Sequence, residues 1–400
     1  MLNRRALLKS LGLAAIAGST PGLTFAKAES DARLVLIVLR GAVDGLALAA
    51  PYGDGNYRSV RGELALSNPG TTEGLLKLDG IFGLHPSFVN LHRSFGAGDA
   101  SVIHAVASPY RSRSHFDGQD MLESGAMKVG GHRDGWLNRA LARVDGQTGN
   151  ASAIALSENT PLILRGANSV ATWAPSRLPG ADDNTLERLQ QLYADDEFFA
   201  TRLQQALRSQ EIAGTQSGMN TTAKRGNDEK QFVDLMKSAA HFLNAPDGPT
   251  IAVAELGGWD THANQGASQG ALARRFGTLD LSLGNLRDGL GDSWEKTVVV
   301  VVTEFGRTVR VNGTRGTDHG TGTAALVMGG AVDGGKVITD WPGLGSNNLY
   351  ADRDLLPTTD LRSVFKAVLA DHLKLPADFI EHEVFPESSS AKPLENLIRT

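Results

Sequence analysis

Long apolar runs without alternation mark the chain at several points. The four longest are residues 33–39, 100–107, 250–256 and 297–303. Runs of this kind are typical of parallel strands that are buried on both faces. Three shorter candidates are residues 154–156, 162–164 and 324–328. The pattern therefore predicts a mostly parallel central sheet.

Segments with helical periodicity fill the intervals between these runs. Apolar residues recur there every three or four positions, as on one face of a helix. The predicted helices are residues 88–95, 135–143, 182–212, 229–244, 266–290 and 357–373. The helix at 266–290 joins two of the long apolar strands, as a right-handed crossover would. This order of elements predicts an α/β protein.

Length, charge and cysteine content limit the possible classes. With 400 residues, we treat positions 29–400 as one domain in which residues 149–227 form a cap or insertion. A net charge of -5 and no basic block outside the N-terminus argue against a nucleic-acid partner. The chain has no cysteine, so a metal would need oxygen or imidazole ligands. Such ligands suit Zn, Mn, Mg or Ca.

The first 28 residues have the features of a targeting segment. Arg4 and Arg5 precede a short apolar run at 11–17, and Ala26-Lys27-Ala28 fits a small-residue cleavage site. The paired arginines resemble a twin-arginine signal, whose export machinery carries folded proteins. We therefore expect this machinery as a partner, and a periplasmic or extracellular location. The alternative is a cytoplasmic protein with a basic N-terminus.

Acidic residues and histidines follow the predicted strands, where parallel α/β sheets collect their chemistry. These residues are Asp44 after 33–39, Asp260 and His262 after 250–256, Glu304 after 297–303, and Asp318 and His319 in the next Gly-rich loop. Together they could hold one or two divalent ions that polarise a phosphoryl or sulfuryl oxygen. The alternative is that the aspartates form turns or helix caps and the histidines bond to loops. We interpret His104, inside the run 100–107, as a core histidine.

Residues 108–120 gather hydroxyl, basic and acidic side chains just before a predicted helix. Ser114 and Asp117 have the spacing of a helix cap. The same position would also expose the Ser114 hydroxyl at the positive end of the helix, where a phosphate or sulfate can sit. Arg111 and Arg113 add anion-binding capacity. The two interpretations have about equal weight.

Five strings in the chain form a recognisable set: LRGAVDGL at 39–46, SHFD at 114–117, GGWDTH at 257–262, TEFGRT at 303–308 and DHG at 318–320. With them the chain resembles a bacterial family of exported proteins that is catalogued as domain of unknown function 1501. The family is placed in the alkaline phosphatase-like superfamily. The resemblance implies a three-layer α/β/α sandwich and a metal set made of Asp44, Asp260, His262, Glu304 and His319.

The superfamily also implies a nucleophile at a helix start, which is Ser114 here or, failing that, Ser112. Two departures stand out. Glu304-Phe305 replaces the Asp-His pair of phosphatases and sulfatases, and the spacing of Asp260 and His262 is tighter than usual. A single ion, an altered coordination in which Asp318 supplies a ligand, or loss of activity would each fit these departures.

Two functions follow as hypotheses. The first is an exported metal-dependent hydrolase of small phosphate or sulfate esters, with Ser114 as nucleophile and Arg111, Arg113 and Arg307 as anion-stabilising residues. The second is a non-catalytic periplasmic binding or assembly protein that keeps the hydrolase fold. A redox enzyme is poorly supported, because the chain lacks a nucleotide-binding glycine motif and the cysteines of an iron–sulfur cluster. Oligomeric state stays open.

Overall fold

The computed structural model describes most of the chain, in several stretches. They are residues 31–144, 152–175, 183–193, 228–246 and 248–399, with a few single positions between 196 and 207. The predicted signal at 1–28 and much of the predicted cap at 149–227 lie outside the described residues. Within the cap, helix α7 (Asp183–Tyr193) covers the first part of the helix predicted at 182–212.

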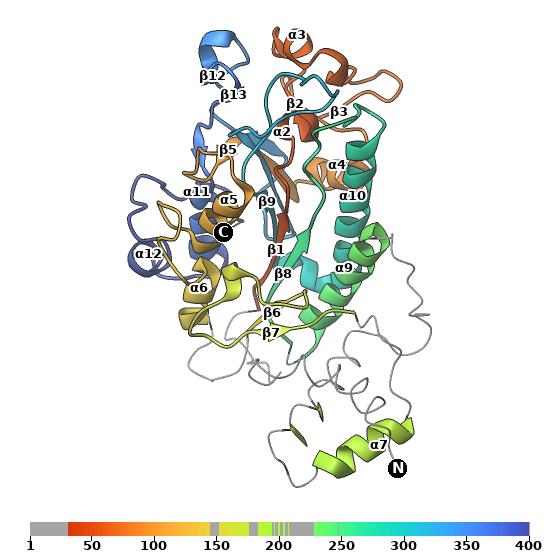
Figure 1. Ribbon diagram of the computed structural model, residues 1–400, viewed down its shortest axis with the longest axis vertical. Coiled ribbons are helices and arrows are strands. Elements are labelled where there is room, and N and C mark those ends of the chain that lie inside the picture. The colour runs from red at the N-terminus through yellow and green to blue at the C-terminus, as the bar shows by residue number, and fades with distance from the viewer. Residues whose placement is uncertain are drawn as a thin grey trace.

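A nine-stranded sheet forms the centre of the described structure, in the order β11-β5-β10-β9-β1-β8-β6-β7 with β14 beside β5 (Figure 1). At its middle, β1 (Arg33–Leu39) lies between β8 (Ile251–Leu256) and β9 (Thr297–Thr303) and runs parallel to both. The other strands are β5 (Ala100–Ala107), β6 (Ala153–Ala155), β7 (Ala171–Thr172), β10 (Thr323–Met328), β11 (Lys336–Ile338) and β14 (Thr359–Asp360). The predicted mostly parallel sheet is confirmed.

Strand β10 is the exception to the parallel direction among the described strands of this central sheet. It pairs antiparallel with both β5 and β9. The amino end of β10 therefore lies at the same edge of the sheet as the carboxyl ends of its neighbours. The loop that precedes β10 is brought to this edge for that reason.

Helices cover both faces of the sheet and complete a three-layer α/β/α sandwich (Figure 1). One face carries α4 (Val89–Gly96), α9 (Asp228–Asn244) and α10 (Ala271–Leu290); the other carries α5 (His115–Ser124), α6 (Trp136–Val144) and α11 (Leu361–Ala367). Strand β1 supplies both hydrophobic cores, because Val35 and Ile37 point to one face and Leu36 and Val38 to the other. This double burial explains the continuous apolar runs.

Smaller elements lie around the sheet. They are α2 (Gly45–Leu48), α3 (Tyr57–Arg61), η1 (Gly62–Leu64), η3 (Gly291–Lys296), η4 (Ser346–Asn348), α12 (Ala377–Phe379) and η6 (Ile380–Val384). In one small antiparallel sheet, β4 (Gly83–Leu84) lies between β2 (Ala49–Ala50) and β3 (Leu76–Lys77). In another, β12 (Leu349–Tyr350) pairs with β13 (Asp354–Leu355).

Three predicted elements differ from the structure by more than a residue or two, and one of them is the helix predicted at 266–290, which begins only at Ala271. Residues 162–164, predicted as a strand, form the 3-10 helix η2 (Leu162–Leu164), in which the Leu164 amide donates to the Pro161 carbonyl over 3.0 Å. An apolar run of three residues does not discriminate between the two conformations. The single helix predicted at 357–373 begins only at Leu361, after the N-cap Asp360, and ends in the π-helix η5 (Val368–His372).

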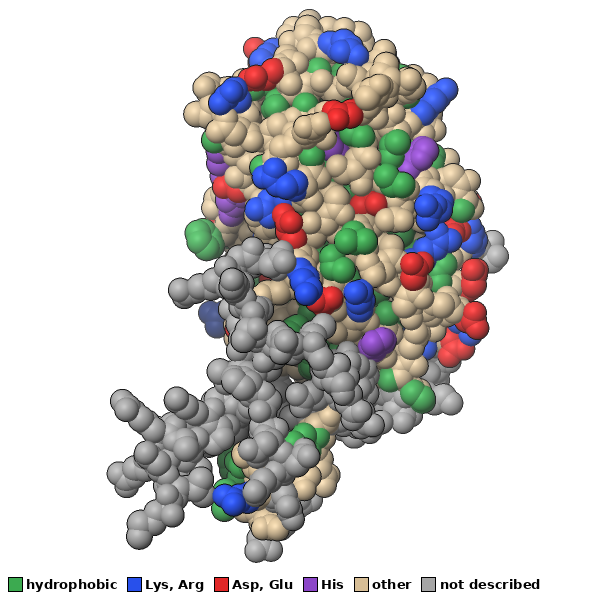
Figure 2. All heavy atoms as spheres, turned by 90° about the vertical axis from the view of Figure 1, so that its right-hand side faces the viewer, with side chains coloured by type: hydrophobic (Ala, Val, Ile, Leu, Met, Phe, Trp, Pro, Cys, Tyr) green, Lys and Arg blue, Asp and Glu red, His purple; other side chains and the backbone are tan. Residues whose placement is uncertain are grey.

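The face that α9 and α10 form shows basic and acidic side chains interspersed, with hydrophobic side chains scattered between them (Figure 2). No helix in the described part of the chain has both the length and the hydropathy to span a membrane.

Candidate metal centre

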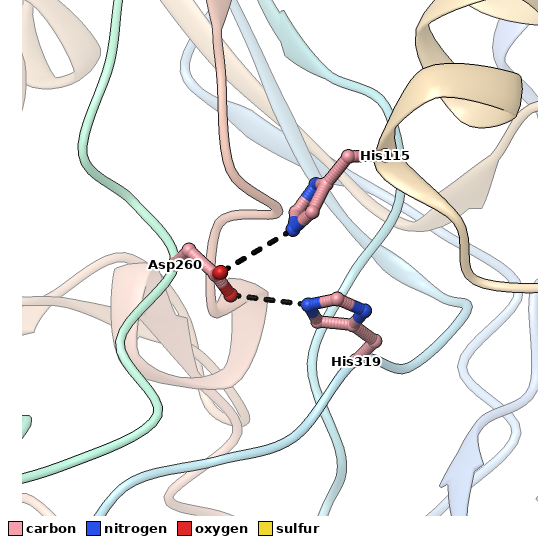
Figure 3. Close-up of side chains that lie close together, drawn as sticks. All are labelled: His115, Asp260 and His319. Atoms are coloured by element: carbon pink, nitrogen blue, oxygen red, sulfur yellow. Dashed lines mark hydrogen bonds and ion pairs between the residues drawn. The ribbon is translucent and has the colours of Figure 1, made fainter.

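Three side chains from distant segments meet at the carboxyl edge of the sheet (Figure 3). His115 begins α5, Asp260 lies in the loop after β8, and His319 lies in the loop before β10. One ligand atom from each lies within 4.8 Å of the others. The Nε2 atom of His115 is 3.5 Å from Asp260 Oδ2, and that of His319 is 3.1 Å from Asp260 Oδ1. This group could hold a metal ion.

A third imidazole, that of His262, joins the group. Its Nε2 atom lies 2.9 Å from Asp260 Oδ1 and 3.1 Å from the Nε2 atom of His319. A glycine makes room for its backbone, because a Cβ at Gly316 would lie 2.4 Å from the carbonyl carbon and oxygen of His262. Three imidazoles thus surround one carboxylate.

Strand direction explains why these segments meet. Helix α5 follows the carboxyl end of β5, and the Asp260 loop follows that of β8. His319 precedes the antiparallel β10, whose amino end lies at the same edge. Edges of this kind collect functional side chains in parallel α/β sheets.

Oxygen atoms fix the orientation of all three imidazoles through Nδ1. The acceptors are Glu304 Oε1 for His115 at 2.8 Å, the Arg113 carbonyl for His319 at 2.9 Å, and Asp318 Oδ1 for His262 at 3.2 Å. We assign the neutral-ring proton to Nδ1 in each case, because an oxygen acceptor there requires a donor. Each Nε2 then presents a lone pair to Asp260. Metal-binding histidines are commonly oriented in this way.

The donor set fits a divalent cation. Lone pairs on nitrogen facing carboxylate oxygens at 2.9–3.5 Å repel one another unless a cation or a proton lies between them. The Nε2 atom of His115 is also buried and has no hydrogen-bond partner among the residues that the structure describes. Three imidazole nitrogens and a carboxylate are ligands that suit zinc and related divalent ions.

Glu304 lies behind His115, and its side chain is fully buried. One oxygen accepts from the Gly41 amide and from His115, each over 2.8 Å, and the other accepts from the Thr303 hydroxyl over 2.8 Å. Burial opposes ionisation, but the bonds from His115, the backbone and Thr303 prevail, and the pKa of Glu304 is lowered. Its hydrogen bond in turn raises the pKa of His115 against the effect of burial.

Asp318 has the corresponding position behind His262. Its side chain is 50% exposed and accepts from the Asn312 amide over 2.9 Å. This bond is the largest cause of a lowered pKa for Asp318; burial opposes it, and His262 adds to it. Asp318 therefore stays ionised and holds the Nδ1 proton of His262.

Two of the three predicted arginines contact carboxylates, whereas Arg111 donates to the backbone carbonyls of Ser108 and Tyr110. The buried guanidinium of Arg307 donates to Asp260 Oδ1 over 2.5 Å and to the Thr317 hydroxyl over 3.2 Å. Burial alone would raise the pKa of Asp260, but Arg307 and the nearby histidines lower it. The Arg113 side chain instead donates to the buried Asp354 over 2.7 Å, so its backbone carbonyl is the part that touches the metal group.

Asp44 lies apart from this group. One of its oxygens caps α2 by accepting from the Leu46 and Ala47 amides, each over 3.2 Å. The other oxygen pairs with the buried guanidinium of Arg61 and accepts from the Gln265 amide over 2.7 Å. The buried carboxylate is thus already neutralised, in agreement with the capping interpretation of Asp44.

Ser114 occupies the N-cap position of α5 in an extended conformation, and its side chain makes no capping hydrogen bond. The residue before it contacts His319 through its carbonyl, and the residue after it is His115. Ser114 is therefore flanked in sequence by two contacts of the metal group.

The structure brings together Asp260, His262 and His319 from the predicted set, and places Glu304 and Asp318 behind two of the imidazoles. His115 was missed as a ligand. The sequence clue to His115 is its position directly after Ser114 in the string SHFD, because consecutive residues at the start of a helix lie at the same edge of the sheet.

Fold and cluster together define an α/β protein with a metal-capable group at the carboxyl edge of its sheet. The chain belongs to the family described as "Protein of unknown function (DUF1501)", whose profile matches residues 95–384. No curated protein sequence matches it.

Several solved structures are similar at low identity. A phosphonate monoester hydrolase of Agrobacterium radiobacter is 13% identical with a TM-score of 0.41, over 86% of this chain and 74% of that one. A protein of the alkaline phosphatase superfamily from Vibrio parahaemolyticus is 11% identical with a TM-score of 0.38, over 92% and 75%. A Pseudoalteromonas sulfatase is 13% identical with a TM-score of 0.37, over 99% and 77%.

Proposed function

We propose that this protein is an exported metal-dependent hydrolase of phosphate or sulfate esters. The supporting observation is that three Nε2 atoms converge on Asp260 and that one of the three imidazoles, His115, directly follows Ser114 in the chain. A divalent cation held by these four side chains would polarise the ester oxygen and lower the pKa of a nearby hydroxyl.

The residues of the chain have separate roles in this proposal. Glu304, Asp318 and the Arg113 carbonyl hold the three imidazoles with their Nε2 atoms toward the centre. Arg307 keeps Asp260 ionised and fixes one of its oxygens, so it is a positioning residue. Ser114 is the nucleophile, at the positive end of α5, where a developing anion is stabilised. Ser112 is the alternative nucleophile.

One observation favours the second hypothesis, a non-catalytic binding or assembly protein with a structural ion. The guanidinium groups of Arg113 and Arg307 are paired with Asp354 and Asp260. Two of the three predicted anion-stabilising side chains are therefore already paired with carboxylates, which leaves the cation, the start of α5 and Arg111 for anion binding.

The decisive experiment uses the full chain purified from its native host, with metal content measured by elemental analysis. Aryl phosphate, phosphodiester, phosphonate and sulfate substrates are then assayed with wild type, Ser114→Ala and the matched variant Ser112→Ala. We expect about one divalent ion per chain and turnover that Ser114→Ala removes. A metal-loaded protein that cleaves none of these esters would instead support the binding protein.

Export needs its own test. Replacing Arg4 and Arg5 by lysine should retain the protein in the cytoplasm, because the paired arginines are the proposed recognition element. Cell fractionation measures the result. Unchanged distribution of the variant would refute twin-arginine export without affecting the metal centre.

A further inference from the structure

A cavity of about 470 Å³ opens beside α5, the helix that begins with His115 of the metal group. Arg40 and Glu255 line it from the ends of β1 and β8, and part of the loop at 159–165 lines it as well. Its volume is within the range of pockets that bind small ligands. It lies at the same carboxyl edge of the sheet as Asp260.

Helix α5 separates the cavity from the metal group and contributes to both. His115 and Gln119, four residues apart, both contact Glu304, at 2.8 Å and 3.3 Å. Phe116, Asp120 and Glu123 form the adjacent stripe of the helix and line the cavity. Gln119 lines the cavity too, so a ligand there would lie one helix stripe from the proposed reaction centre.

The charges at the cavity are mostly paired with one another. The Arg40 guanidinium donates to Glu123 over 2.7 Å and also to Glu255. The second Glu123 oxygen accepts from the Ile163 amide over 3.0 Å. These contacts fix the side chains in place. An anionic ligand would meet carboxylates here, and a cationic ligand would meet Arg40.

The polar side chains that line the cavity combine donors and acceptors beside an aromatic ring, although each also makes a hydrogen bond within the fold. Gln119 and Arg165 present N–H donors, while Asp120 and Glu255 present carboxylate oxygens. Phe116 is 85% exposed, the largest exposed fraction among the exposed large hydrophobic side chains of the described residues, so its ring is open to a ligand. The hydroxyl groups of a sugar both donate and accept hydrogen bonds. The C–H face of a sugar ring packs on aromatic rings.

We propose that this cavity binds a sugar or similar polyol, as the alcohol portion of the ester that the metal group would cleave. Only the claim that the bound sugar is part of the substrate rests on the proposed function. Sugar binding itself depends on Phe116 and on the polar side chains of the cavity.

The test is a glycan array probed with the metal-loaded full chain, followed by calorimetry with the best neutral oligosaccharide. Phe116→Ala should weaken that affinity roughly tenfold, and Phe116→Trp should retain it. Leu281→Ala is the matched control, because Leu281 is 51% exposed on α10, across the sheet. It should leave affinity unchanged.

The two proposals fail separately. Binding of no glycan, or equal affinity in Phe116→Ala and wild type, would overturn the polyol site even if aryl esters are cleaved. Displacement of the glycan by choline at a lower concentration than by free sugar would assign the cavity to a cationic group instead. Glycan binding that requires Phe116 in a protein without esterase activity would retain the polyol site and refute the hydrolase.

Discussion

Asp44 and Asp260 both follow strands of the parallel sheet, yet they lie in opposite environments. Around Asp44, Arg61 and Gln265 are fully buried, and both carboxylate oxygens are used within the fold. The Asp260 side chain is 41% exposed and faces three imidazoles. In our assignment their Nε2 atoms carry no proton. We call these the closed and the open region.

The difference shows that the role of an aspartate at a strand end depends on the source of the positive charge beside it. In the closed region, a buried arginine supplies the positive charge permanently. In the open region, Arg307 reaches only one oxygen of Asp260, and the imidazoles leave room for a further cation. Residue type and position after a strand do not separate these outcomes.

The largest expected effect concerns the closed region. Asp44→Ala leaves the Arg61 charge buried and unpaired, which should cost about 3–5 kcal/mol of unfolding free energy. Urea unfolding in the presence of a chelator measures it. The double variant Asp44→Ala, Arg61→Met should recover part of the loss. A folded Asp44→Ala protein that has lost a metal ion would show that Asp44 is a ligand and abolish the comparison.

His104 packs beside the closed region and makes stability depend on pH. Its Nε2–H donates to the Ala49 carbonyl over 2.8 Å and its Nδ1 accepts from the Ala105 amide, so the ring is neutral, as expected for a core histidine. Burial lowers the pKa of His104 to about 4. Between that value and the ordinary pKa near 6.5, the unfolded chain binds the extra proton, so stability falls as pH falls.

This loss should reach about 3 kcal/mol from pH 6.5 to 4. Chelator-treated protein unfolded by urea at several pH values gives the slope. His104→Gln should flatten that slope, whereas His382→Gln, a change in an exposed C-terminal helix, should not. An unchanged slope in His104→Gln would contradict a neutral buried ring.

In the open region, Glu304→Gln tests the orientation of His115. Loss of the anionic acceptor at Nδ1 should weaken metal affinity about 10- to 100-fold. Competition with a chromophoric chelator measures the affinity. Glu255→Gln is the matched control, because Glu255 pairs with Arg40 outside the metal group. Equal affinities for the two variants would remove Glu304 from the site.

The smallest effect is expected for Asp318→Asn. Its side chain is half exposed, and asparagine still offers His262 an oxygen, so affinity should fall about tenfold or less. The same competition assay applies. A loss larger than that of Glu304→Gln would indicate that Asp318 itself binds the ion.

Long strands were predictable from sequence because double burial demands continuous apolar residues. The runs at 33–39, 100–107 and 297–303 became strands with the same bounds. The helix at 229–244 differed by a single residue at its start. Short elements were less predictable, as residues 162–164 show, because three residues carry too little periodicity.

The site was predictable only in part. Sequence position identified Asp260, His262 and His319, since strand ends converge in a parallel sheet. It did not reveal that Arg61 neutralises Asp44, because that contact depends on how a short helix packs. Nor did sequence position distinguish Glu304, which orients His115, from Asp260, which faces the three imidazoles, because both carboxylates follow strands.

The spread of the metal group along the chain has a consequence for how an ion would be acquired. Its members range from position 115 to position 319, and they meet only once β5, β8 and β10 share one sheet. A nascent chain that does not yet include His319 would bind the ion poorly, so binding of the ion would indicate that the sheet has formed. If folding precedes export, the metal pool of the cytoplasm, and not that of the destination, selects the ion.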